Sequence, residues 1–301
     1  MARAMGTLFV ETAHGDMNIV DQEICTGDVY FVDSGSGNAG DTAQHGRSRQ
    51  YPFATLAYAV TQVTAGQGDF ILLAPGHAEN VAAAAGIDCN LGNITIMGVS
   101  GHTQDMPVIT FTAALSDINI DADGVKFKNI HFVNTFDTNA APIDVNAANA
   151  HFENCIFEDD GTDTTVVWIL AATAATGLTV INCVNRGTDT PGNTAWISMA
   201  DVSHPRIIGN RSNGDFSAAN ITSTAAATDV LIDGNVLENA NAVDANIVMF
   251  AASTGFITRN HCKIATDAQI TWIAPANCMG GENYGVNNNG ECGMITGAVS
   301  V

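Results

Sequence analysis

Short stretches in which apolar and polar residues alternate make up most of the chain. Typical examples are "KFKNIHF" at residues 126–132, "HFENCIF" at 151–157 and "IDGNVLE" at 232–238. Each stretch is long enough for only one or two strands, and the residues between stretches are mostly Asn, Gly, Asp and Thr, which favour turns. Alternation of this kind predicts half-buried β-strands. Helical spacing of apolar residues is rare, so the pattern predicts an all-β protein.

These stretches repeat along the chain with a period of about 25 residues, a length typical of solenoid repeats. When they are aligned they share an asparagine flanked by β-favouring positions, and successive copies are almost evenly spaced. The shared asparagines are Asn129, Asn154, Asn182, Asn210, Asn235, Asn260 and Asn283. A second strand follows each of them, for example "VVWIL" at 166–170 and "TAWISM" at 194–199. A repeat made of strands and turns predicts a β-solenoid, whose coils bury their inner side chains by stacking.

The repeated asparagine has a structural explanation. Asn tolerates left-handed backbone geometry at a sharp corner, and stacked amide side chains can hydrogen-bond from one coil to the next. We therefore predict that the seven asparagines form a structural ladder and not a catalytic set. Cys155 and Cys183 each follow a repeat asparagine, so we expect them to be reduced, stacked neighbours on adjacent coils.

One helix is predicted, at about residues 52–65. Pro52 suits a first helical turn, and Gly66 provides a C-terminal stop. The apolar residues between them recur at helical spacing and are Phe53, Leu56, Ala57, Val60 and Val63. An open solenoid end exposes an apolar interior and an unpaired strand edge. We therefore expect this helix to cap the N-terminal end of the solenoid.

The segment 33–81, which contains "QYPFATLAYAV" and "GDFILLAPGHAENV", resembles the opening of right-handed parallel β-helix proteins of the pectate-lyase-like superfamily. The matching positions are Pro52, Phe53, Thr55, Leu56, Ala59, Gly68, Asp69, Ile71, Pro75 and Gly76. With the repeats, the resemblance covers about residues 30 to 300. It implies a parallel β-helix with a capping helix, and it is weak for function because this fold carries lyases, hydrolases, tailspikes and structural virion proteins. Among these, the chain looks most like phage virion β-helix proteins, which are typically trimers.

Charge limits the partners of the chain. Asp and Glu number 31 against 10 Lys and Arg, which gives a formal net charge of −21. A surface that tracks nucleic-acid phosphates needs a basic stripe, so we expect no nucleic-acid partner. No apolar run reaches the length of a membrane span, so we expect no membrane partner. The N-terminal residues make a poor signal peptide, which disfavours a non-viral secreted carbohydrate-binding protein.

The sequence does not show a catalytic constellation. A lyase needs a basic residue beside a carboxylate cluster that holds Ca²⁺, and a hydrolase needs two carboxylates facing each other on one surface. No arginine recurs on a coil face with a matching aspartate cluster, and no histidine pair has the spacing of a zinc site. Asp137, Asp163, Asp189 and Asp215 recur at a constant step, as solvated turn residues or as cation ligands. We predict no catalytic, metal or cofactor-binding residues, and therefore no cofactor.

Two tryptophans are candidates for a subunit contact. Trp168 and Trp196 follow the repeat asparagines Asn154 and Asn182 at the same offset. The alternation in "TAWISM" places Trp196 with Thr194 and Ser198, so we expect it to point outward. Burial of Trp168 and Trp196 against a neighbouring subunit is our main interpretation, with sugar stacking and core packing as the alternatives.

Taken together, these features predict a parallel β-helix at residues 29–301 and an N-terminal attachment arm at residues 1–28. The main hypothesis is a structural protein of a bacteriophage, a homotrimeric capsid decoration or cement protein on the virion surface. Its partners would be other virion proteins, above all the major capsid protein. The alternative is a short tailspike or a polysaccharide-degrading lyase or hydrolase that binds host glycans in the solenoid groove.

Overall fold

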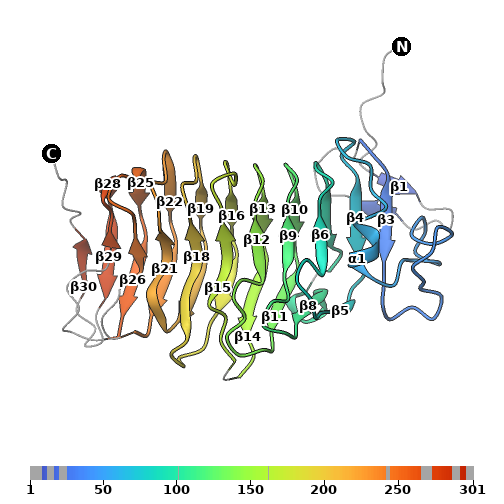
Figure 1. Ribbon diagram of the computed structural model, residues 1–301, viewed down its shortest axis with the longest axis horizontal. Helices are drawn as coiled ribbons and strands as arrows, with labels where there is room; N and C mark the ends of the chain where they lie inside the picture. The colour runs from blue at the N-terminus through green and yellow to red at the C-terminus, as the bar shows by residue number, and fades with distance from the viewer. Residues whose placement is uncertain are drawn as a thin grey trace, which may run out of the picture.

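The computed structural model describes residues 26–100, 102–161, 163–241, 245–265 and 273–286, together with strands at 9–11, 17–19 and 292–295. The molecule is a rod of stacked coils (Figure 1). Each full coil contributes one strand to each of three parallel sheets that run along the rod, here called the first, second and third sheets in chain order. The predicted all-β, right-handed parallel β-helix is therefore confirmed, with about eight turns.

Each of the three sheets runs from the N-terminal to the C-terminal end of the rod. The first sheet contains β3 (Val29–Val32), β4 (Phe70–Leu73), β7 (Thr95–Gly98), β10 (Lys126–Lys128), β13 (His151–Glu153), β16 (Thr179–Ile181), β19 (Arg206–Ile208), β22 (Val230–Asp233), β25 (Thr254–Thr258) and β28 (Asn277–Gly281). The second contains β5 (Ala78–Val81), β8 (Val108–Phe111), β11 (His131–Asn134), β14 (Ile156–Asp159), β17 (Val184–Arg186), β20 (Arg211–Gly214), β23 (Val236–Asn239), β26 (His261–Ile264), β29 (Asn283–Val286) and β30 (Cys292–Ile295). The third contains β6 (Ile87–Cys89), β9 (Ile118–Ile120), β12 (Ile143–Val145), β15 (Val167–Ala171), β18 (Asn193–Met199), β21 (Phe216–Ser223), β24 (Ile247–Val248) and β27 (Ile273–Ala274).

The core follows from the alternation seen in the sequence. In β11, Phe132 and Asn134 point inward and are buried, while the flanking His131 and Val133 face outward. Equivalent positions of successive coils lie next to each other inside the rod, so side chains of the same kind stack on one another. The rings of Phe132 and Phe157 lie 5.3 Å apart and are stacked at 23°. Such columns form one continuous apolar core along the rod.

The helix is much shorter than predicted. Only α1 (Leu56–Ala59) is helical, and the prediction of a helix over 52–65 is wrong in extent. The backbone of Phe53 is bonded to β3, because its N–H donates to Phe31 and its C=O accepts from Asp33. Residues tied to a strand in this way cannot also be helical. Leu56 and Ala59 are fully buried, and α1 contacts β3, β4 and β6 at the N-terminal end of the rod (Figure 1).

The residues that carry the family resemblance join this segment to the first coils. The Asp69 carboxylate accepts hydrogen bonds from the backbone N–H groups of Asp28 and Thr64, both at 2.7 Å. The buried Glu79 carboxylate accepts from the N–H groups of Leu56 and Ala57, the latter at 3.0 Å, at the start of α1. Asp69 and Leu56, two of the residues that carry the resemblance, therefore take part in hydrogen bonds that join this segment to the first coils.

The two ends of the chain add short antiparallel elements. β1 (Phe9–Glu11) and β2 (Met17–Ile19) form a two-stranded sheet of their own, and β30 pairs antiparallel with β29. A single 3₁₀ turn, η1 (Thr103–Asp105), lies between β7 and β8. Among the described residues, no helix is long and apolar enough to cross a membrane.

Candidate functional site

The repeat asparagines occupy two adjacent positions of the coil. Asn129, Asn154 and Asn182 adopt left-handed backbone geometry at the corner between the first and second sheets. The described coils place a left-handed residue at this corner in the order Asn129, Asn154, Asn182, Gly209, Gly234, Arg259 and Glu282, with φ from 53° to 67°. Asn and Gly suit this corner because they adopt positive φ at low cost.

The other four asparagines lie one residue later and point inward. They are Asn210, Asn235, Asn260 and Asn283, and all are buried. Side-chain amides donate from Asn210 to Asn235 at 3.0 Å, from Asn235 to Asn260 at 2.9 Å and from Asn260 to Asn283 at 3.0 Å. The seven residues thus form a three-residue corner set and a four-residue amide ladder, not one ladder.

In the earlier coils the inward position holds Ile130, Cys155 and Cys183. Both cysteines are free, and burial raises the pKa of the Cys183 thiol well above its ordinary value. A buried thiol of this kind is a packing residue and not a nucleophile.

The main interpretation of Trp168 and Trp196, burial against a neighbouring subunit, is wrong, and the core-packing alternative holds. The exposed fractions of Trp168 and Trp196 are 1% and 0%, and both indoles make edge-on contacts with Phe157 inside the rod. Ala195 and Ile197 on either side of Trp196 are buried as well, so alternation does not separate an inner from an outer face at this position. Neither ring can reach a second subunit or a sugar.

Charged side chains on the second sheet are paired from coil to coil. Glu158 accepts a hydrogen bond from Arg186 at 2.7 Å and lies 3.2 Å from the His131 imidazole, which joins β11, β14 and β17. Burial lowers the pKa of His131, and the Glu158 charge offsets only part of that effect. Further along the same sheet, Lys263 of β26 pairs with Glu238 of β23.

The first sheet carries an equivalent cluster. Glu153 accepts from Lys128 at 3.0 Å and lies 3.3 Å from His151. Burial acts to raise the pKa of Glu153, but the hydrogen bonds and charges of Lys128 and His151 together outweigh it and hold this pKa below its ordinary value. Arg259 likewise pairs with Asp233 on the neighbouring coil. Each carboxylate in these clusters is held by a cation one coil away.

The described residues contain no group of three or more His, Cys, Asp or Glu side chains that could hold a metal ion. The aspartates that recur at a constant step lie in the turns after the second sheet, and Asp137 and Asp215 accept hydrogen bonds at 2.9 Å from Thr164 and Asn241. Their role as solvated turn residues agrees with these bonds.

A depression of about 550 Å³ on the second sheet is the best candidate for a binding site. Its floor is formed by Arg211 and Asn213 of β20, with Arg186 and Glu238 on the adjacent coils. The connection from β20 to β21 is Asp215 alone, whereas the preceding one spans 187–192 and brings Asp189 to the rim. Arg211 makes no ion pair with any described residue, unlike Arg186 and Lys263 on the same sheet.

The depression can bind polar ligands but has no arranged acid and base. Its guanidinium and amide groups donate hydrogen bonds, its carboxylates accept them, and Val184 and Val236 supply apolar surface. The sequence contained a signal for this grouping, because Arg186, Arg211 and Glu238 all fall in the short strand that follows a repeat asparagine. Equivalent strands of a solenoid lie side by side in one sheet.

The comparisons with known proteins bear on the fold. The solved structure of a rhamnogalacturonan lyase matches with a TM-score of 0.52 and 13% identity over 79% of this chain and 69% of that chain. A pectin methylesterase from Aspergillus niger matches with a TM-score of 0.46 and 12% identity over 89% and 88%. No protein-family model and no curated protein matches the sequence. The first likeness agrees with the parallel β-helix and shows the fold alone.

Proposed function

We propose that this protein is a non-enzymatic structural component of a bacteriophage particle, a homotrimeric capsid decoration protein on the virion surface that contacts the major capsid protein. The main support is the pairing of the charged side chains. An acid or base catalyst must exchange protons with a substrate. In the clusters around Glu158, Glu153 and Glu238, the carboxylate is instead bonded to a cation on an adjacent coil, which stabilises the stack.

The net charge and the N-terminal segment support a rod that faces solvent and is attached to the capsid through its N-terminal arm. A net charge of −21 keeps rods in solution apart and opposes binding to nucleic acid. β1 and β2 lie in a sheet separate from the solenoid, which suits an arm that binds the shell. α1 and its buried residues would close the N-terminal end of the apolar core.

Attachment through the arm is tested by truncation. Asp28 bonds to Asp69 and Phe70, so the deletion that preserves the first coil removes only residues 1–25. We expect the truncated protein to have the same melting temperature as the intact protein. We also expect that it no longer binds to phage particles from which the intact protein is absent. Co-sedimentation with such particles measures the occupancy. Full occupancy by the truncated protein contradicts the decoration role.

Glycan binding, with or without cleavage, is the second candidate and is favoured by the depression around Arg211. Carbohydrate hydroxyls are both donors and acceptors, which matches its mixed lining. Incubation with host polysaccharide, with and without Ca²⁺, distinguishes the candidates. Our proposal predicts no release of reducing ends or unsaturated sugars. Release that is lost in Arg211→Ala but kept in Arg206→Ala would establish the enzyme instead.

A further inference from the structure

The outer face of the third sheet changes character along the rod. One outward position runs through all eight of its strands, from Asp88 to Ala274. In the first three strands this position is Asp88, Asn119 and Asp144. In the remaining five it is Leu170, Ser198, Thr222, Val248 and Ala274, of which Ser198 and Thr222 are buried within the chain. The acidic row becomes an uncharged row at β15.

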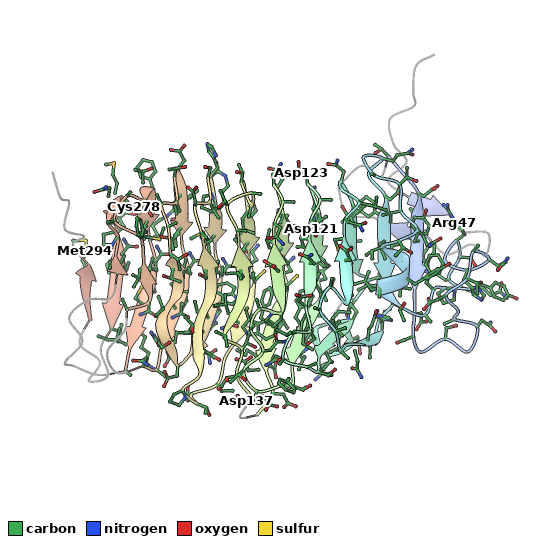
Figure 2. All side chains as sticks on the ribbon, viewed as in Figure 1. Arg47, Asp121, Asp123, Asp137, Cys278 and Met294 are labelled. Carbon is green, nitrogen blue, oxygen red and sulfur yellow. The ribbon has the colours of Figure 1, made fainter. Side chains whose placement is uncertain are left out.

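The position two residues further along lies just past the strand ends. In the N-terminal half it holds Asn90, Asp121 and Asn146, so Asp121 is its one carboxylate, and Figure 2 also shows Asp123 in this half. From β15 onward it holds Ala172, Ala200, Thr224, Phe250 and Ala276. These five residues and the five from Leu170 to Ala274 are called the uncharged face. Leu170 and Phe250 are its large exposed side chains, with exposed fractions of 37% and 46%.

The other two sheets are charged in the same coils. The second sheet presents Arg186, Arg211 and Lys263, and the first presents Arg206. The uncharged face is therefore a property of one side of the rod. It spans five strands, about 20 Å along the axis at the usual strand spacing.

Carboxylates gather on the N-terminal half of the same sheet. Burial raises the pKa of Asp117, and the charges of Asp144 and Asp121 raise it further. Burial also raises the pKa of Asp144, with the Asp121 charge acting in the same direction. The like charges therefore interact within one molecule and would repel the same group on a second molecule.

We infer that the uncharged face is the contact between copies of this chain, an inference that rests on the proposed homotrimer. Each copy carries a charge of −21, so two copies approach most easily where neither presents a carboxylate. An anionic or cationic partner would gain nothing from this face. The occupant that fits is another copy of this chain, with the uncharged faces of the three copies turned towards a common axis and Leu170 and Phe250 packed in the contact.

The carboxylates on the N-terminal half of the third sheet determine how the copies are arranged relative to one another. Copies that run parallel meet along β15 to β27, while the N-terminal coils stay apart because Asp88, Asp121 and Asp144 repel their counterparts. Raising the salt concentration screens this repulsion and should tighten the assembly.

Matched substitutions test the contact. Phe250→Glu places a charge on the uncharged face, and Phe256→Glu places one on the first sheet, where Phe256 is 52% exposed. Leu170→Glu and Leu115→Glu form a second pair, because Leu115 is 67% exposed in the turn before β9. Sedimentation measures the oligomeric state, and circular dichroism with thermal melting checks that each variant is folded. We expect Phe250→Glu and Leu170→Glu to weaken association at least tenfold and both controls to assemble as the wild type does.

Trimers that persist in Phe250→Glu and Leu170→Glu overturn the inferred contact and leave the proposed trimer standing. Equal weakening in all four variants also overturns it, because the effect would then be general charge repulsion. A wild type that stays monomeric at high protein and salt concentration overturns both the contact and the trimer. Release of sugars from polysaccharide bears on the proposed function and not on the contact.

Discussion

At the residue scale, Asp159 carries the most perturbed carboxyl group of the rod interior. Its exposed fraction is 6%, and it accepts hydrogen bonds from Thr165 at 2.5 Å and from Asn193 at 3.2 Å. Burial raises its pKa to about 6, and the hydrogen bonds from Thr165 and Asn193 offset only part of that effect. The Asn193 side-chain oxygen beside it is buried and makes no hydrogen bond within the described structure.

Replacing this carboxyl group should change how stability depends on pH. Because the pKa is raised on folding, the contribution of Asp159 to stability is full below about pH 4 and is lost as the pH rises through about 6. A shift of about two pKa units corresponds to roughly 3 kcal/mol. We expect Asp159→Asn to unfold at higher denaturant concentration than the wild type at pH 7.5, with an advantage of up to about 3 kcal/mol that shrinks towards pH 4. An advantage that does not vary with pH would contradict this explanation.

The two sets of asparagines should respond differently to substitution. Asn235→Leu leaves the Asn210 N–H and the Ile207 carbonyl without their partners, which should cost about 3–5 kcal/mol. Asn182→Leu only strains a left-handed corner and should cost about 1–2 kcal/mol. Asn182→Gly should be close to neutral, because Gly occupies this corner in later coils. Chemical denaturation gives the ranking, and an equal cost for the two leucine variants would refute the division.

At the element scale, α1 depends on side chains from elsewhere in the chain. A helix of four residues is too short to be stable alone. The Thr55 hydroxyl caps the helix locally. The Glu79 carboxylate, which belongs to β5, accepts hydrogen bonds from the first N–H groups of the helix. His77 is buried beside Glu79, with its Nε2 3.3 Å from the carboxylate.

Removing this cap should open the N-terminal element and spare the rest of the rod. In Glu79→Ala we expect the amides of residues 54–60 to lose most of their protection from hydrogen exchange, because two N–H groups lose a charged acceptor. Glu238→Ala, which removes an ion pair on the second sheet, is the control and should leave these amides protected. Unchanged exchange in Glu79→Ala would mean that packing of Leu56 and Ala59 alone holds the helix.

The sequence pattern predicted the elements better than it predicted their details. The alternation and the repeat identified the strands and the solenoid, because both depend on side-chain type alone. The division of the asparagines was missed because alignment by residue identity merged Asn182 with Asn210, which occupy neighbouring positions with opposite roles. The predicted helix was too long because the helical spacing of Phe53 in the sequence does not reveal that the Phe53 backbone is hydrogen-bonded at β3. Trp196 was placed outward because alternation assigns it to the face opposite Ala195 and Ile197, whereas all three side chains are buried.

The candidate site was less predictable than the fold. The paired residues His131, Glu158 and Arg186 could have been grouped by their offsets from the repeat asparagines. The depression around Arg211 depends on the short connection at Asp215, and connection lengths follow from strand ends that the sequence places only approximately.

At the scale of the whole molecule, the rod has two distinct halves. On the third sheet, Asp88, Asp121 and Asp144 lie in the N-terminal half. Exposed large apolar side chains are concentrated towards the C-terminal end, from Val236 to Met294, and they lie on all three sheets. We expect the charge to keep such rods apart in solution and association to occur through the uncharged face. Both properties suit a protein that is displayed in many copies on the surface of a particle.

The central claim is that these rods are structural parts of a virion. Electron cryo-microscopy of the native phage particle, compared with a particle that lacks this gene product, tests it most directly. Our account predicts additional density at regular positions on the capsid, made of groups of three rods that meet along their C-terminal coils and are attached at their N-terminal ends. Density confined to the tail tip, or shells that do not differ between the two particles, would contradict it.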